Sequence, residues 1–162
     1  MIVVADSGPL IAFAILGQLD VLHQLYGQVL IPQEVWVEVV IQGDGEAGSN
    51  EVRAAGWIEV VGNSPSVLFT ALREQLDPGE AAALALASER CADLVLVDDR
   101  RGRAMAPRLG LRVRGTLGVL VEAKRSGLVP AVMPLVARLL DQGFRASSEV
   151  VAEIAELTGE VG

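Results

Sequence analysis

The chain has 162 residues, of which 51% are hydrophobic and only 4% aromatic. This length suits one domain with an aliphatic core, and the single cysteine, Cys91, excludes a disulfide or a thiolate metal site within one chain. The net charge of −8 argues against a protein that binds nucleic acid over its whole surface.

The chain carries no pattern of secretion or membrane insertion. Its first twenty residues contain no Lys or Arg, so we expect no secretory signal peptide. No uncharged apolar stretch reaches the about 18 residues of a membrane span. We therefore expect a cytoplasmic protein with no membrane partner, in which Cys91 is a buried and inert thiol.

Short apolar runs alternate along the chain with segments of helical pattern. The apolar runs predict strands at 2–5, 28–32, 57–61, 94–97 and 111–115. Helices are predicted at 17–25, 32–42, 65–75, 77–91, 98–110, 116–125, 130–142 and 147–158, with a glycine-rich loop at 43–49. Pro107 should kink or shorten its helix.

Strands that alternate with helices predict right-handed crossovers in a parallel sheet. The expected fold is therefore α/β: a three-layer α/β/α sandwich with a central, mainly parallel sheet of four to five strands. We expect residues 1–130 to form the domain core, and the helices within 131–162 to pack on it or extend from it.

Two of the predicted strands end in acidic residues. Asp6 follows the first strand, and Asp98 and Asp99 follow the strand at 94–97. Because the carboxyl ends of parallel strands share one edge of a sheet, these carboxylates should lie close together. Such clusters persist where a cation neutralises them, and oxygen ligands favour Mg²⁺ or Mn²⁺.

Glu38 and Glu80 are further candidates, but each acid also has a simpler interpretation. Asp6 can be only the N-cap of a following helix, with Pro9 in the first turn. Glu80 can close a capping box with Asp77, three residues before it. Glu38 can belong to a solvated polar stripe together with the residues four positions before and after it.

The acids lie within motifs that together resemble a known family. The motifs are "VVADSGPLI", "IPQEVWVEV", "LDPGEAAALALA", "LVLVDDRRGRAMAPRLGLRV" and "GTLGVLVEAK". Their combination resembles the PIN-domain nucleases, and most closely the prokaryotic PIN-like proteins with a "DSGPLI" start that are related to VapC-type toxins. The resemblance covers residues 1 to about 130.

This resemblance implies an acidic pocket that holds one or two Mg²⁺ or Mn²⁺ ions. By position, the catalytic acids would be Asp6, Glu38, Glu80 and Asp98. The metal ligands would be Asp6, Glu80 and Asp98, with Asp99 as an alternative fourth pocket acid. Ser7 would help to position Asp6. A threonine that the family commonly has near this strand end is absent, with Val97 in its place.

Positive charge is concentrated directly after the fourth acid. Eight of the thirteen Lys and Arg residues lie between Arg100 and Arg125. Arg100, Arg101 and Arg103 could hold substrate phosphates beside the metal. The alternative is that this segment is merely a solvated helix face.

The function that the resemblance implies is metal-dependent hydrolysis of RNA. The protein would be an endoribonuclease that cleaves single-stranded RNA, the toxin of a toxin–antitoxin pair. Its partners would be a small antitoxin protein and a second copy of the chain, in a homodimer that uses exposed apolar groups of the helix within 17–27. The alternative is a catalytically weak or inactive PIN-fold protein that binds nucleic acid or regulates another protein.

Overall fold

The structure, a computed structural model, describes residues 1–62 and 66–161. Within this part of the chain, five strands form one sheet in the order β3-β2-β1-β4-β5, and every pairing is parallel. The strands are β1 (Val3–Ala5), β2 (Val29–Pro32), β3 (Ile58–Val61), β4 (Leu94–Leu96) and β5 (Val113–Arg114). The predicted fold class is therefore confirmed, and each predicted strand is present.

Helices connect the strands and follow the last of them. They are α1 (Ser7–Ile15), α2 (Asp20–Tyr26), α3 (Gln33–Trp36), the π-helix η1 (Val37–Gln42), α4 (Ser49–Ala54), α5 (Val67–Leu72), α6 (Pro78–Glu89), α7 (Arg100–Arg108), α8 (Thr116–Arg125), α9 (Met133–Asp141) and α10 (Ser148–Thr158). The predicted start of the α5 helix at residue 65 lies outside the described residues. Helix α7 ends one residue after Pro107, two residues earlier than predicted.

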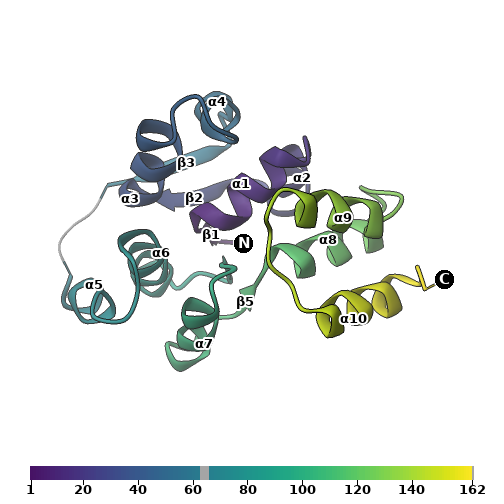
Figure 1. The fold of residues 1–162 in the computed structure, drawn as a ribbon. Helices are drawn as coiled ribbons and strands as arrows, with labels where there is room; N and C mark the ends of the chain where they lie inside the picture. The colour runs from purple at the N-terminus through teal and green to yellow at the C-terminus, as the bar shows by residue number, and fades with distance from the viewer. Residues whose placement is uncertain (63–65, 162) are drawn as a thin grey trace.

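The strand side chains alternate between two apolar layers. Val3 and Ala5 of β1 pack in one core cluster with α1, α2, α8, α9 and α10. Val4, between them, packs in a second cluster with α5, α6 and α7. Figure 1 shows α5, α6 and α7 gathered on one side of the molecule, and α8, α9 and α10 on the other. This alternation makes both faces of the sheet apolar, as a doubly covered parallel sheet requires.

The predicted helix at 32–42 changes its geometry halfway. It begins as α3 and continues as η1, a π-helix that directly precedes Gly43. A Cβ on Gly43 would lie 2.6 Å from the Val39 carbonyl oxygen and 3.0 Å from that of Glu38, so only glycine fits there. Short π-helical turns are rare and often occur at functional sites. Helix α4, which follows, is not predicted by the sequence, because the glycines before it indicate a loop.

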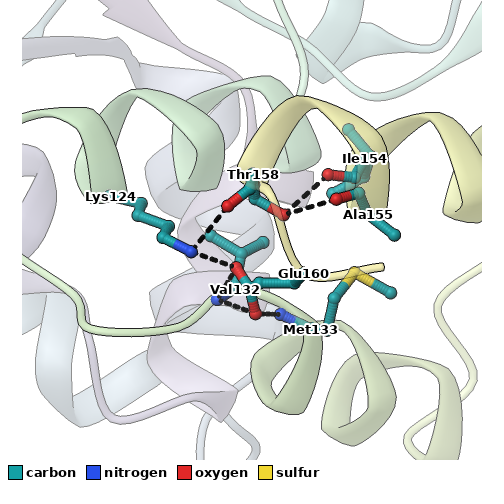
Figure 2. A network of polar contacts seen from close by, with 7 residues as sticks. All are labelled: Lys124, Val132, Met133, Ile154, Ala155, Thr158 and Glu160. Atoms are coloured by element: carbon teal, nitrogen blue, oxygen red, sulfur yellow. Dashed lines mark hydrogen bonds and ion pairs between the residues drawn. The ribbon is translucent and has the colours of Figure 1, made fainter. Parts of the chain in front are cut away.

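The C-terminal helix is held through Glu160 (Figure 2). The Glu160 carboxylate accepts hydrogen bonds from the backbone N–H groups of Val132 and Met133, at 2.9–3.0 Å, where α9 begins. It also pairs at 2.9 Å with Lys124 Nζ of α8, which donates to the Thr158 carbonyl oxygen at 2.7 Å. These contacts tie α10 to both α8 and α9.

Two expectations about surface residues were wrong. Cys91 is exposed, because the chain turns through a left-handed φ of 49° just after α6 and does not extend that helix into the core. The apolar side chains of α2 are largely buried: Leu22 and Tyr26 belong to the core cluster. This helix therefore does not present the exposed apolar groups expected for a dimer or an antitoxin. Helix α2 also lies before the amino end of β2, whereas Asp6 and Asp98 follow the carboxyl ends of β1 and β4, so α2 is not at the edge of the sheet that carries these acids.

Candidate active site

Asp6 lies at the carboxyl end of β1, the middle strand of the sheet. Its backbone N–H donates to the Leu96 carbonyl oxygen at 2.9 Å. It occupies the N-cap position of α1, but its side chain makes no capping hydrogen bond. The residue is 5% exposed, and within the described residues its Oδ1 atom has no hydrogen-bond partner. Because an unpaired buried carboxylate oxygen is costly, capping alone does not explain this aspartate.

The electrostatic surroundings of Asp6 disfavour its charge. Burial is the main cause that raises the pKa of Asp6 to about 8; the Ser7 backbone N–H opposes the shift, and the carboxylates of Glu80, Asp77 and Glu38 add to it. When ionised, these four carboxyl groups repel one another. The cluster therefore takes up either protons or a cation.

Three of these carboxylates converge on one glycine. A Cβ on Gly79 would lie 2.8 Å from Glu38 Oε2, 3.3 Å from Asp6 Oδ1 and 3.7 Å from Asp77 Oδ1. The three acids come from η1, the end of β1 and the N-cap of α6. Any side chain at position 79 would fill the space toward which they point.

Glu38 combines the two interpretations of its sequence pattern. The residue as a whole is exposed, but its carboxylate is partly buried, and this burial raises its pKa. The Asp77 charge raises the pKa further, and a hydrogen bond from the Ser7 hydroxyl opposes the shift. Glu38, Glu34 and Gln42 border an open hollow of about 600 Å³, which we call the η1–α6 hollow. The hollow is lined by Gln33, Glu34, Val37, Glu38, Gln42, Asp77, Pro78 and Gly79. The polar stripe thus faces this hollow beside the acids.

Glu80 is both a capping residue and a buried acid. Its backbone N–H donates to Asp77 Oδ1 at 2.9 Å, as in a capping box. The residue is only 9% exposed. Burial raises the pKa of Glu80 to about 7, with further contributions from the charges of Asp77 and Asp99. The capping box therefore keeps the Glu80 carboxylate close to Asp77, within the cluster of acids around Asp6.

Asp98 and Asp99 have different surroundings. Asp98 accepts from the Thr116 backbone N–H at 2.7 Å and from the Thr116 hydroxyl at 2.6 Å. Burial raises its pKa, while the Thr116 hydrogen bonds and the Arg103 charge oppose the shift. Asp99 is exposed and caps α7 by accepting from the backbone N–H of Arg101 and Gly102. Asp98 is thus the more enclosed of the two.

The structure brings Asp6, Glu38 and Glu80 together with Asp77, but sets Asp98 slightly apart. Asp98 Oδ2 lies 3.3 Å from the position of a Cβ on Gly8, in the first turn of α1, and Asp98 is not among the charges that raise the pKa of Asp6. In the described residues, no group of three or more Asp, Glu, His or Cys side chains has the spacing of a formed metal site. The oxygen-only donors and the unpaired Asp6 Oδ1 nevertheless fit a hard divalent cation.

The three arginines predicted to position substrate differ in their contacts. Arg103 Nη1 and Asp98 Oδ1 each lie 3.0 Å from the position of a Cβ on Gly115, so this guanidinium stands beside the fourth acid. Arg101 Nη1 donates to the Gln75 carbonyl oxygen at 3.4 Å. Arg100 is exposed at the start of α7. All three belong to the first turn and a half of α7, the helix that follows β4.

Sequence reasoning missed Thr116 and the contribution of Asp77 to the cluster. The hydroxyl expected near Val97 comes instead from Thr116, which follows β5, the neighbouring strand. The sequence did contain a clue to this role, because Thr116 directly follows a predicted strand, in the "GTLG" motif. Asp77 was predicted only as a cap, and the spacing did not show that its Oδ1 atom, 3.7 Å from the position of a Cβ on Gly79, lies beside Glu38 and Asp6.

The membership of the chain in a family is shown by comparison with known proteins. The model of a family described as "PIN domain" matches residues 2–160, and so includes the C-terminal helices to which the motifs had assigned no resemblance. A search of curated proteins found no match. Among the described residues, no helix combines the length and apolarity of a membrane crossing. With an acidic cluster at the carboxyl edge of its parallel sheet, the chain belongs to the PIN-domain family, whose fold is of the nuclease type.

Proposed function

We propose that this protein is a divalent-metal-dependent endoribonuclease that hydrolyses single-stranded RNA. The observation that carries the proposal is the buried Asp6 carboxylate, whose Oδ1 atom has no partner and points with Glu38 and Asp77 into the space at Gly79. A bound cation would supply the missing partner. Membership of the PIN-domain family supports nucleic acid as the substrate class.

Asp6, Glu80 and Asp98 would hold Mg²⁺ or Mn²⁺, and Glu38 would orient the attacking water. A divalent ion in such a site lowers the pKa of its water and stabilises charge on phosphate oxygens. Ser7 hydrogen-bonds to Glu38 and Thr116 fixes both oxygens of Asp98, so each restrains an acid before metal binds. Because no formed metal group is present in the described residues, binding must draw the carboxylates closer together.

Arg100, Arg101 and Arg103 would hold substrate phosphates on the β4 side of the acids. Their side chains are exposed, and α7 presents its amino end beside Asp98. We further place the enzyme in the cytoplasm, as the toxin of a toxin–antitoxin pair with a small antitoxin and a homodimeric state. These last assignments rest on the resemblance of its motifs to VapC-type relatives.

The test is cleavage of an end-labelled single-stranded RNA in Mn²⁺ and in EDTA. The wild type should cleave only with the metal, and Asp6→Asn and Glu80→Gln should reduce cleavage to background. Asp20→Asn is the matched control, because Asp20 is an exposed acid at the start of α2, which precedes the amino end of β2. Full activity of Asp6→Asn would refute the assignment of this acid.

A second candidate is a PIN-fold protein that binds RNA without cleaving it. The lack of a formed metal group in the described residues favours this alternative. Wild-type protein that binds the same RNA but leaves it intact in Mg²⁺ and in Mn²⁺ would establish the binding role and exclude the nuclease.

A further inference from the structure

The η1–α6 hollow adjoins the acids but differs from them in chemistry. Its volume of about 600 Å³ is in the range of small-ligand sites. Gly79 lines it, and the buried, unpartnered Asp6 Oδ1 lies 3.3 Å from the position of a Cβ on that glycine. The hollow is therefore continuous with the proposed reaction centre, not a separate surface depression.

The charge of the hollow excludes a phosphate. Its lining includes the carboxylates of Glu34, Glu38 and Asp77, and none of its described lining residues is Lys or Arg. Of the α7 arginines, Arg103 stands beside Asp98, whereas Arg101 donates to the Gln75 carbonyl oxygen, two residues before Asp77. An RNA strand across Asp6 therefore meets the Arg103 guanidinium beside Asp98, whereas the described lining of the hollow offers its phosphates no cation.

The remaining lining suits a flat heterocycle with hydrogen-bond donors. Val37 and Pro78 offer apolar surface, and Gln33 and Gln42 offer amide groups. Ionised carboxylates only accept hydrogen bonds. An amino group of a base can donate to them, whereas a carbonyl oxygen in the same place is repelled.

We propose that the η1–α6 hollow binds the base of a nucleotide next to the scissile bond, and that it prefers a base with an amino group there, such as cytosine, to uracil. This inference rests on the proposed function, since it assigns the specificity of the same site. It also gives the substrate a direction: base toward η1, backbone toward α7.

The inference is tested by binding without catalysis, with fluorescence anisotropy in EDTA near pH 8. The probes are labelled oligo(C), oligo(U) and an abasic oligonucleotide of equal length and charge. Wild-type protein should bind oligo(C) about tenfold more tightly than the abasic strand, with oligo(U) between them. Because no variant is involved, this comparison does not depend on the folding of a mutant.

A pair of variants on η1 locates the effect. Val37→Gln places a longer polar side chain in the hollow and should bring oligo(C) binding down to the level of the abasic strand. Ile41→Gln changes an exposed residue of the same helix that does not line the hollow, and should leave all three affinities unchanged.

The outcomes separate this inference from the proposed function. Equal binding of the three strands by a protein that cleaves RNA in Mn²⁺ would overturn the base site and leave the nuclease standing. Equal weakening of all three strands by Val37→Gln would also overturn it. If none of the strands binds, the base site and RNA as the substrate fail together.

Discussion

At the scale of single residues, the carboxylates of the site differ in the hydrogen bonds that they accept. Asp6 has an oxygen with no partner, whereas both oxygens of Asp98 accept hydrogen bonds from Thr116. Thr116 is fully buried, so water could not take over its hydrogen bond to Asp98 if the hydroxyl were removed. Its role is therefore to fix the orientation of the Asp98 carboxylate.

Replacing the Thr116 hydroxyl tests this role. Thr116→Val leaves an oxygen of Asp98 unsatisfied and should lower the free energy of unfolding by about 2 kcal/mol. Thr116→Ser keeps the hydroxyl and loses only a methyl group, which should cost about 0.8 kcal/mol. Urea unfolding of both variants decides the matter. A larger loss for serine than for valine would mean that methyl packing, not the hydrogen bond, is what the site needs.

At the scale of secondary structure, the π-helix η1 determines where Glu38 lies. Its last turn brings the Val39 carbonyl oxygen to 2.6 Å from the position of a Cβ on Gly43. Gly43→Ala should force the backbone to shift and reduce stability by about 1 kcal/mol or more. It should also lower RNA cleavage, because Glu38 moves with the helix.

Gly56→Ala is the control, since nothing lies within 4 Å of the added methyl group. Its stability should stay within about 0.5 kcal/mol of the wild type. Thermal melts and cleavage assays of both variants provide the comparison. If Gly43→Ala keeps full stability and activity, the π-helical turn has no positioning role.

Helix α7 should contribute to RNA binding through its arginines. Reversing Arg101 and Arg103 to Glu should weaken binding and flatten its dependence on salt, by about 0.7 in the log–log slope for each lost phosphate contact with a single strand. Reversing Arg90 and Arg145, which are exposed elsewhere, makes the same charge change and should have a smaller effect. Equal effects of the two pairs would show that the α7 arginines act only through the net charge of the protein and do not contact RNA phosphates.

The sequence predicted the elements better than their surroundings. Strand ends at Asp6 and Asp98 followed from apolar runs that stop at a carboxylate, and the capping box at Asp77 followed from residue spacing. Thr116 and Gly79 could not be placed, because their contacts join segments far apart in the chain. The exposure of Cys91 and the burial of α2 depend on packing between elements, which local periodicity does not record.

At the scale of the whole molecule, Glu160 links the C-terminal helix to the core. Burial acts to raise its pKa, but hydrogen bonds from Val132, Met133 and Lys124 outweigh this and lower it to about 2. A carboxylate whose folded-state pKa lies below its unfolded value contributes stability above that unfolded value, here 4.5, and loses the contribution as the pH falls toward 2.

Glu160→Gln should therefore destabilise the protein near neutral pH by about 1 kcal/mol, and the difference should shrink steadily as the pH falls below 4.5 toward 2. Urea midpoints measured from about pH 7 to about pH 3 give the profile. Glu153→Gln, which changes an exposed residue of α10, should follow the wild type throughout. A destabilisation by Glu160→Gln that persists unchanged in acid would show that the charge of Glu160 is not what holds α10.

We propose that the carboxylate cluster around Asp6 holds a divalent cation. Without metal, Asp6→Asn removes a repelling charge from a buried group, so it should melt at a higher temperature than the wild type in EDTA. With Mn²⁺ the order should reverse. The wild type gains stability according to its affinity, about 2.7 kcal/mol at a concentration one hundred times its Kd, and the variant gains little.

Thermal melts of the wild type and Asp6→Asn, each in EDTA and in Mn²⁺, test this cation site. If the cluster binds the metal, the melting curves of the two proteins exchange order when Mn²⁺ is added. A wild type that shows no shift with Mn²⁺, and an Asp6→Asn variant that melts together with it in EDTA, would contradict the metal site.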